Sequence, residues 1–378
     1  MKKYSFHWAG IIFALWIMLL IFIASIVPRY LPQTLFVGSR NNFDERLPRW
    51  LYDNPLPKWI WMWANLDGGH YVSIARDGYY KNEHGFFPFY PLMIRFVHSV
   101  TSAPFIICGL LISYLSLFGF IKLFMNLFRN DHVRTNPYWL QWWMMTFPAV
   151  FFLISVYNDS FYLFLTMLVF HFVGKKKWWL ARIAAYAVGL TRITSLALFP
   201  ALLIEGWRSK KNRTELWTAA VCAPLGVLSY LGYLERFEGG WHVFFDSMAI
   251  WGQNKFVFPI QTFWRYTKIL ATYHHFDQIF FVSLIELSLI LFAAYLLIVG
   301  KKMIRESLWA YSLAVTILPS TSGTGSGFPR YFIHAFPLIM ILAIAFRKKR
   351  FLTIVIGLVF LFIQLVSFSF FSQGYFVS

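Results

Sequence analysis

Residues 105–128 read FIICGLLISYLSLFGFIKLFMNLF, an apolar run with one lysine. A helix of this length can cross the ~30 Å hydrocarbon core of a lipid bilayer. Similar runs lie at 11–27, 218–234, 279–299 and 351–371. The whole chain is 58% hydrophobic and 13% charged, whereas soluble domains carry about 25% charged residues. We therefore predict an all-α polytopic membrane protein in which residues 1–378 form a single transmembrane domain.

The distribution of lysine and arginine predicts how the chain is threaded. Short basic tracts lie between the apolar runs, at 129–134, 175–177, 208–213, 301–305 and 347–350. Because cytoplasmic loops are enriched in basic residues, we place these tracts and the N-terminus in the cytoplasm and the C-terminus outside. The helices that satisfy this arrangement, about eleven, are expected near 8–28, 104–127, 138–155, 158–173, 178–190, 194–206, 217–236, 279–299, 307–319, 331–346 and 350–371.

The predicted threading leaves five external segments, at 29–103, 156–158, 191–193, 237–278 and 320–330. The first is too long for an idle loop and mixes aromatic with charged residues, so we expect short helices lying in the membrane interface. The two short helices 178–190 and 194–206 are interrupted at Thr191-Arg192. Broken backbone inside a membrane requires protein or a water-filled cavity to satisfy its polar groups, so this break indicates a cavity.

The net charge of +18 does not indicate a nucleic-acid-binding protein. The basic residues are grouped in short tracts between apolar runs rather than along one polar surface, which is typical of topology signals and of attraction to anionic membrane lipids. Cys108 and Cys222 both lie inside apolar runs, with no histidine or cysteine at ligand spacing, and are expected to be packing residues.

The first polar group is Asp67-Gly68-Gly69-His70-Tyr71, followed by a stretch that can form a helix and that ends in Arg76-Asp77-Gly78. A carboxylate at a helix N-terminus is favoured by the helix dipole, and it suits either a helix cap or a general base. The neighbouring histidine, His70, can be structural or catalytic.

The second group is Tyr157-Asn158-Asp159-Ser160, in a tight external turn between two predicted helices. Asn-Asp-Ser is ordinary turn and capping chemistry. The alternative is that Asp159 is a second carboxylate facing the same external cavity as Asp67. The spacing leaves both interpretations open.

Two arginines, Arg192 and Arg330, are expected on the external side, against the trend of the other basic residues. Arginine at membrane depth is costly, and its planar fork matches phosphate oxygens, so both are candidates for holding an anion. Snorkelling to the interface or an ion pair with Asp67 or Asp159 are the alternatives. The stretch 323–327 before Arg330 lacks the Gly-Lys-Ser/Thr ending of a Walker loop and is predicted to be a flexible external loop.

A metal site is not expected. His274 and His275 lie near Asp277, but adjacent histidines point in different directions and no third ligand has suitable spacing.

Together these groups resemble the PIG-V type mannosyltransferase family of GT-C class membrane glycosyltransferases. The family pattern is approximately Trp-Asp-x-x-Trp/His-Tyr-x-x-Ile-Ala-x-x-Gly-Tyr, then Phe-Phe-Pro-x-Tyr-Pro. The residues that match it are Asp67, His70, Tyr71, Ile74, Ala75, Gly78, Tyr79, Phe86, Phe87, Pro88, Tyr90 and Pro91. Later support comes from the segments 157–162, 190–192 and 329–331, with Pro337.

Two positions depart from the family pattern. Leu66 replaces the aromatic residue before the aspartate, which concerns packing, and Asp159 stands where glutamate is usual, which shortens the side chain and puts its role in question. The resemblance says little about residues 205–320.

The resemblance implies inverting transfer of a sugar, mannose or another hexose or pentose, from a polyprenyl-phosphate donor to an acceptor hydroxyl on a glycan, lipid or protein at the external face of a bacterial plasma membrane. Asp67 would then be the catalytic base, and Arg192 and Arg330 would stabilise the departing lipid phosphate. The expected substrate or donor contacts are His70, Tyr71, Arg76, Tyr157, Asp159, Arg192, Arg330 and Tyr331. No obligatory metal or other cofactor is implied. A transporter or flippase for a lipid-linked or anionic substrate is the main alternative, since it also needs broken helices and intramembrane charge.

Overall fold

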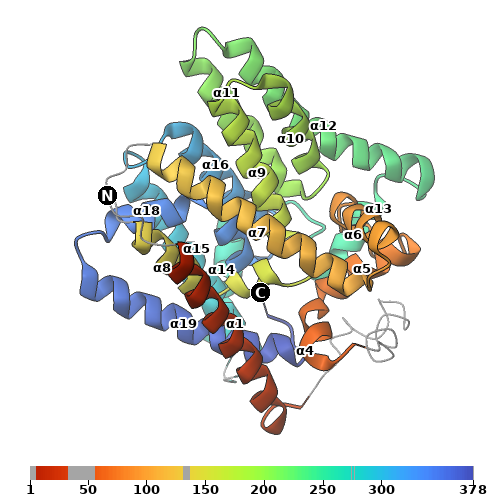
Figure 1. The fold of residues 1–378 in the computed structure, drawn as a ribbon, viewed down its shortest axis with the longest axis vertical. Helices are drawn as coiled ribbons and strands as arrows, with labels where there is room; N and C mark the ends of the chain where they lie inside the picture. The colour runs from red at the N-terminus through yellow and green to blue at the C-terminus, as the bar shows by residue number, and fades with distance from the viewer. Residues whose placement is uncertain (1–5, 33–55, 131–136, 274, 276, 378) are drawn as a thin grey trace.

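The computed structural model describes residues 6–32, 56–130, 137–273, 275 and 277–377. All regular structure in these ranges is helical, without a strand, and 17 α-helices are present in them. The prediction of an all-α chain is confirmed for the described residues. Figure 1 shows the helices packed into one body, with α7 and α9 near the centre of the view and α18 near its left edge.

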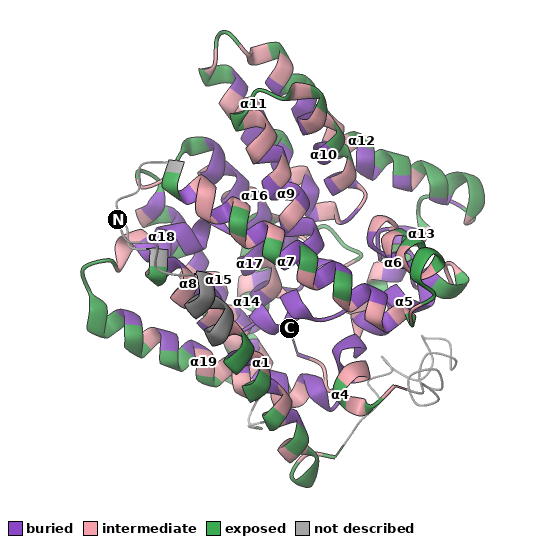
Figure 2. Ribbon diagram, in the orientation of Figure 1, coloured by how far each residue is buried: buried purple, intermediate pink, exposed green. Residues whose placement is uncertain are grey.

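Within the described ranges, four helices are long and apolar enough to cross a membrane, namely α7 (Phe105–Asn130), α12 (Arg213–Phe237), α15 (Gln278–Gly300) and α19 (Arg350–Ser372). Their outward faces are apolar: only 33% of the apolar stretch of α19 is buried, and Phe351 and Phe362 on it are exposed. Figure 2 shows such exposed residues along the outward faces of α12 and α19. Exposed apolar faces of this extent suit contact with lipid rather than with water.

The remaining helices in the packed body are shorter or lie at its edge. They are α1 (Phe6–Ile26), α8 (Pro137–Thr146), α9 (Asp159–Gly174), α10 (Trp178–Gly189), α11 (Leu198–Arg208), α16 (Glu306–Ser320), α17 (Phe328–His334) and α18 (Pro337–Ala345). If the bent pair α17 and α18 counts as one crossing, up to five spans are present by length and composition among the described residues.

Two predicted helices are interrupted, which corrects the expected continuous helices at 138–155 and 331–346. The first ends with α8 at Thr146, and a 3-10 turn follows at Val150–Ile154. Pro148 lies at this break and has no backbone N–H to donate. The Gln364 side chain compensates, since its Nε2 donates to the carbonyl oxygens of Met145 and Phe147 at 3.1 and 2.7 Å.

The second interruption bends α17 against α18 by 81°. Pro337 is the first residue of α18, and the chain turns just before it. The Tyr311 hydroxyl donates to the His334 carbonyl oxygen at 3.1 Å, so the carbonyl group at the break has a partner.

The predicted break at Thr191-Arg192 is confirmed. Helix α10 ends at Gly189, and a 3-10 turn (Ile193–Ala197) leads into α11. The Thr191 carbonyl oxygen, which the break leaves without a helical partner, accepts from Asn158 Nδ2 at 2.8 Å. Gly189 packs directly on Gly226 of α12, where an added Cβ would overlap the partner helix backbone.

Short helices occupy the segments expected outside the membrane. They are α4 (Lys58–Trp61), α5 (Asp67–Asp77), α6 (Phe89–Thr101), α13 (Val243–Met248) and α14 (Pro259–Thr272). In Figure 1, α4, α5, α6 and α13 gather at the right and lower right, away from α16 and α18. Residues 33–55 of the long first segment lie outside the described residues.

Candidate functional site

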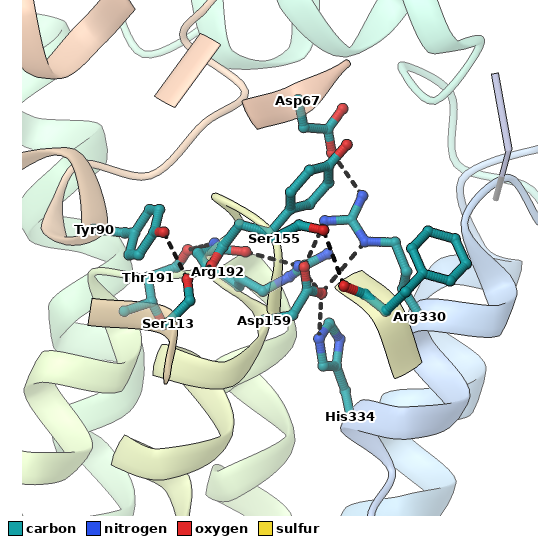
Figure 3. A network of polar contacts seen from close by, with 12 residues as sticks. Asp67, Tyr90, Ser113, Ser155, Asp159, Thr191, Arg192, Arg330 and His334 are labelled. Atoms are coloured by element: carbon teal, nitrogen blue, oxygen red, sulfur yellow. Dashed lines mark hydrogen bonds and ion pairs between the residues drawn. The ribbon is translucent and has the colours of Figure 1, made fainter. Parts of the chain in front are cut away.

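Four charged residues from distant parts of the chain meet at one point (Figure 3). Asp67 is the first residue of α5, Asp159 is the first residue of α9, Arg192 lies in the break after α10, and Arg330 lies on the short helix α17. The interruptions before α9, after α10 and after α17 therefore lie beside this group. The sequence singled out all four residues, and the structure brings them within hydrogen-bonding distance.

Arg330 is the centre of the group. Its Nη1 donates to Asp67 Oδ2 at 2.6 Å, while Nη2 and Nε donate to the two oxygens of Asp159 at 3.0 and 3.3 Å. The guanidinium carbon lies 4.7 Å from the Tyr157 ring centroid and 5.1 Å from that of Phe152. Bidentate pairing and aromatic contact together fix the guanidinium plane.

Asp159 is the buried anchor of the group, with a side chain that is 2% exposed. Besides Arg330, it accepts from Arg192 Nη1 at 2.9 Å, and His334 Nε2 lies 2.7 Å from its Oδ1. The histidine contact has ion-pair distance but not the alignment of a hydrogen bond. Since a buried carboxylate is costly unless cations compensate it, the two arginines explain how Asp159 is tolerated.

Asp67 is the more accessible carboxylate, with a side chain that is 19% exposed. It occupies the first turn of α5, where the helix dipole favours a negative charge, but its side chain does not cap the helix and pairs with Arg330 instead. The preceding residue, Leu66, has φ +57°, which is strained for a branched side chain. The strained turn directs Asp67 toward the cavity described next.

A cavity of about 130 Å³ opens beside this group. Asp67, Arg192 and Arg330 line it, together with Tyr71 and Tyr331. Its lining also includes the apolar residues Phe87, Phe244, Met248, Trp251, Phe376 and Val377. A ligand that fills the cavity would meet two arginines, one accessible carboxylate and several apolar side chains.

Two tyrosines at the site remain neutral hydroxyl groups. Burial raises the pKa of Tyr71 and Tyr157 well above the ordinary value. The Tyr157 hydroxyl donates to the Asn65 carbonyl oxygen at 3.0 Å, which ties the turn before α9 to the turn before α5. Both phenols therefore act as uncharged groups and not as bases.

Two of the residues that the sequence predicts to contact substrate lie outside the lining of the cavity. His70 Nδ1 lies 3.0 Å from Glu83 Oε1, and the imidazole stacks on Phe86 at a centroid distance of 4.8 Å. Arg76 pairs with its neighbour Asp77 at 2.6 Å. Neither His70 nor Arg76 lines the cavity.

Two contributors were missed by sequence reasoning. His334 lies four residues after Arg330 on α17, a spacing that places two side chains on one face of a helix and that could have identified it. Asn158 was noted only as a turn residue, yet its Oδ1 accepts from Arg192 Nη1 at 2.9 Å and its Nδ2 supports the break at Thr191.

Metal-ligating side chains do not gather in threes anywhere in the described ranges. Of the histidine pair noted above, His274 lies outside the described residues, and Asp277 caps α15 by accepting from the backbone N–H groups of Ile279 and Phe280.

Comparison of the chain with protein-family models, with curated proteins and with solved structures gives no match.

Proposed function

We propose that this chain is a membrane glycosyltransferase of GT-C-like architecture, similar to the PIG-V type family, with about eleven transmembrane helices. It would transfer a sugar from a polyprenyl-phosphate donor to an acceptor hydroxyl at the external face of the plasma membrane. The observation that carries the proposal is that Asp67, Arg192 and Arg330 line the same cavity. A carboxylate beside two guanidinium groups suits a reaction that removes a proton and releases a phosphate.

Arg192 and Arg330 would bind the donor phosphate. Guanidinium groups bind phosphate oxygens in bidentate fashion, and both side chains are only 13% exposed, so water screens them little. Arg192 already pairs with Asp159, and Arg330 pairs with both Asp159 and Asp67. Of these two carboxylates, Asp67 is the more accessible. A phosphate that takes over Nη1 of Arg330 would release Asp67.

Asp67 would then act as the general base. The acceptor hydroxyl oxygen attacks the anomeric carbon, the bond from that carbon to the phosphate oxygen breaks, and the hydroxyl proton passes to Asp67. The lipid phosphate leaves with the bonding electrons, held by the two arginines. The negative charge that develops on the leaving oxygen is thus stabilised where the cations already lie.

The position of the cavity favours a transferase over a transporter. Its walls come from 66–87, 152–158, 191–193, 244–253, 326–331 and 376–377, which are external segments or helix ends in the predicted threading. The basic tracts 175–177, 208–213, 301–305 and 347–350 lie elsewhere, where α9 meets α10, α11 meets α12, α15 meets α16 and α18 meets α19. A transporter would require a path that reaches both faces.

The test is sugar transfer in membranes that contain the full chain, incubated with polyprenyl-phosphate hexoses and pentoses. We expect release of lipid phosphate by the wild type and its loss in Asp67→Asn, with Asp77→Asn on the same helix as the matched control. Wild-type turnover in Asp67→Asn at equal expression would exclude the base assignment. Movement of a lipid-linked sugar across the membrane without release of lipid phosphate would support transport instead.

A further inference from the structure

The chain between α13 and α15 exposes a group of large apolar side chains. Phe256, Phe258, Ile260 and Trp264 are 77%, 67%, 72% and 65% exposed. The last two lie four residues apart on α14 and therefore share one face, whereas Thr262 and Tyr266 on the other side are buried. Helix α14 has 14 residues, too few to cross a bilayer. We call Phe256, Phe258, Ile260 and Trp264 the aromatic face.

The inner side of the same segment holds the loop that leads to Arg330. The Thr262 hydroxyl donates to the Ser320 carbonyl oxygen at 2.7 Å, and the Val257 N–H donates to the Thr321 carbonyl oxygen at 2.9 Å. Arg265 Nη1 donates to the Gly323 carbonyl oxygen at 3.1 Å. The loop 320–327 includes the stretch 323–327 that the sequence predicts to be flexible. Hydrogen bonds from the segment of α14 hold it at Ser320, Thr321 and Gly323.

The end of this loop sets the start of α17. Gly327 has φ +83° and donates its N–H to Glu286 Oε1 of α15 at 3.1 Å. Its carbonyl oxygen accepts from the Arg330 N–H at 2.9 Å. Gly327 and Arg330 are one helical turn apart. A shift of the loop would therefore move the guanidinium group that pairs with Asp67 and Asp159.

The other end of α14 lies at the start of a membrane-spanning helix. The Tyr273 hydroxyl donates to Asp277 Oδ2 at 2.6 Å, and Asp277 caps α15. Helix α15 is one of the four that are long and apolar enough to cross a membrane. Since a span begins at the boundary of the hydrocarbon core, α14 is held at that boundary.

The charge of the segment is suited to lipid headgroups. Residues 253–273 carry Lys255, Arg265 and Lys268 and no acidic residue. Aromatic side chains next to basic ones are typical of helices that lie in the interface of an anionic membrane.

We propose that the aromatic face inserts into the interfacial layer of an anionic phospholipid bilayer, and that this anchoring holds loop 320–327 and Arg330 in place. The anchoring part is independent of the reaction. The consequence for Arg330 rests on the function proposed above.

The anchoring is tested with an environment-sensitive nitrobenzoxadiazole label on single cysteines. In full-length protein that carries Cys108→Ala and Cys222→Ala, the label is placed at Ile260→Cys or Trp264→Cys, with Asp246→Cys as the control, since the Asp246 side chain is 70% exposed on the neighbouring α13. The protein is placed in nanodiscs of phosphatidylcholine with or without phosphatidylglycerol. We expect nitroxide lipids to quench the labels on α14 and aqueous iodide to quench the label at Asp246→Cys.

Quenching of the α14 labels by iodide to the extent seen at Asp246→Cys would overturn the anchoring. So would shielding that appears only when two copies share a nanodisc, because the occupant would then be a second copy. If the cysteine-free background does not fold, cross-linking of a photoreactive amino acid at position 264 to lipid, compared with the same residue at position 246, gives the same decision.

The consequence for Arg330 is tested by Ile260→Asp/Trp264→Asp. We expect the KM for the lipid donor to rise about fivefold, the factor that corresponds to one net hydrogen bond, with Asp246→Asn as the control. If nitroxide lipids quench the α14 labels but the kinetics of Ile260→Asp/Trp264→Asp equal those of the wild type, the link to Arg330 is excluded and the anchor stands. If the wild type shows no transfer at all, the proposed function fails, and the label experiment still decides the anchor.

Discussion

Asp67 and Arg330, 263 residues apart in the sequence, form an ion pair of 2.6 Å at the edge of the cavity. Asp67 is the proposed base and Arg330 is a proposed phosphate ligand. When no substrate is bound, the two side chains pair with each other. An incoming phosphate must compete with the Asp67 carboxylate for Arg330. Binding of the donor and release of the base are therefore coupled in the proposed mechanism.

Asp67→Asn should separate these two effects. Turnover should fall by about 10²–10⁴, the usual contribution of a general base. Affinity for the lipid phosphate should rise, because the variant no longer places a negative charge on Arg330. Transfer assays and binding of polyprenyl phosphate in nanodiscs measure the two quantities. Weaker binding in the variant would contradict the exchange of partners at Arg330.

Arg330→Lys should retain the fold but weaken donor binding by about tenfold, the equivalent of one charged hydrogen bond. A lysine supplies a positive charge to the two carboxylates but cannot make the bidentate contact with Asp159. Arg95→Lys is the matched control, since Arg95 donates to the backbone carbonyl oxygens of Ile74 and Ala75 rather than to the cavity group. Equal donor affinity in Arg330→Lys and the wild type would argue against phosphate binding at this arginine.

Asp159→Asn should destabilise the protein by about 3–5 kcal/mol, because it leaves Arg192 without a counter-charge and Arg330 with Asp67 alone. Asp159→Glu keeps the charge and should lose much less. Unfolding by heat or denaturant in detergent gives the comparison. If the asparagine variant is as stable as the wild type, the buried ion pairs do not stabilise the interruptions before α9, after α10 and after α17.

Gly189→Val should destabilise the protein by about 1–3 kcal/mol, the usual cost of overpacking. Helices α10 and α12 touch at Gly189 and Gly226, so a side chain must push them apart. Because Gly189 immediately precedes the break that carries Arg192, donor affinity should fall as well. Gly232→Ala on α12 is the control: a Cβ there meets no neighbouring atom within 4 Å, so its stability should be unchanged or raised. Equal stability of the two variants would contradict the close crossing.

Local pattern was enough to predict parts of the site. The break at Thr191-Arg192 follows from two apolar stretches too short to be one span, and the structure has it there. The predicted threading singles out Arg192 and Arg330 as arginines outside the basic tracts, and it leaves open an ion pair with Asp67 or Asp159. The structure contains these ion pairs.

Local pattern failed where a contact depends on a distant partner. The continuous helices expected at 138–155 and 331–346 are broken, and the freed carbonyl groups accept hydrogen bonds from Gln364 and Tyr311, which lie far along the chain. His70, which the sequence places beside the substrate, lies against Glu83.

The sequence by itself determined that this chain is helical and apolar enough for a membrane, because composition and the length of apolar runs are properties of each segment alone. It also indicated which polar residues are out of place in such a chain. Only the tertiary structure decided that Arg330 bridges Asp67 and Asp159, that His334 joins them, and that α14 holds the loop before Arg330. These contacts form where the ends of interrupted helices meet. Each such end is stable only when a side chain far along the chain forms hydrogen bonds with its free backbone groups.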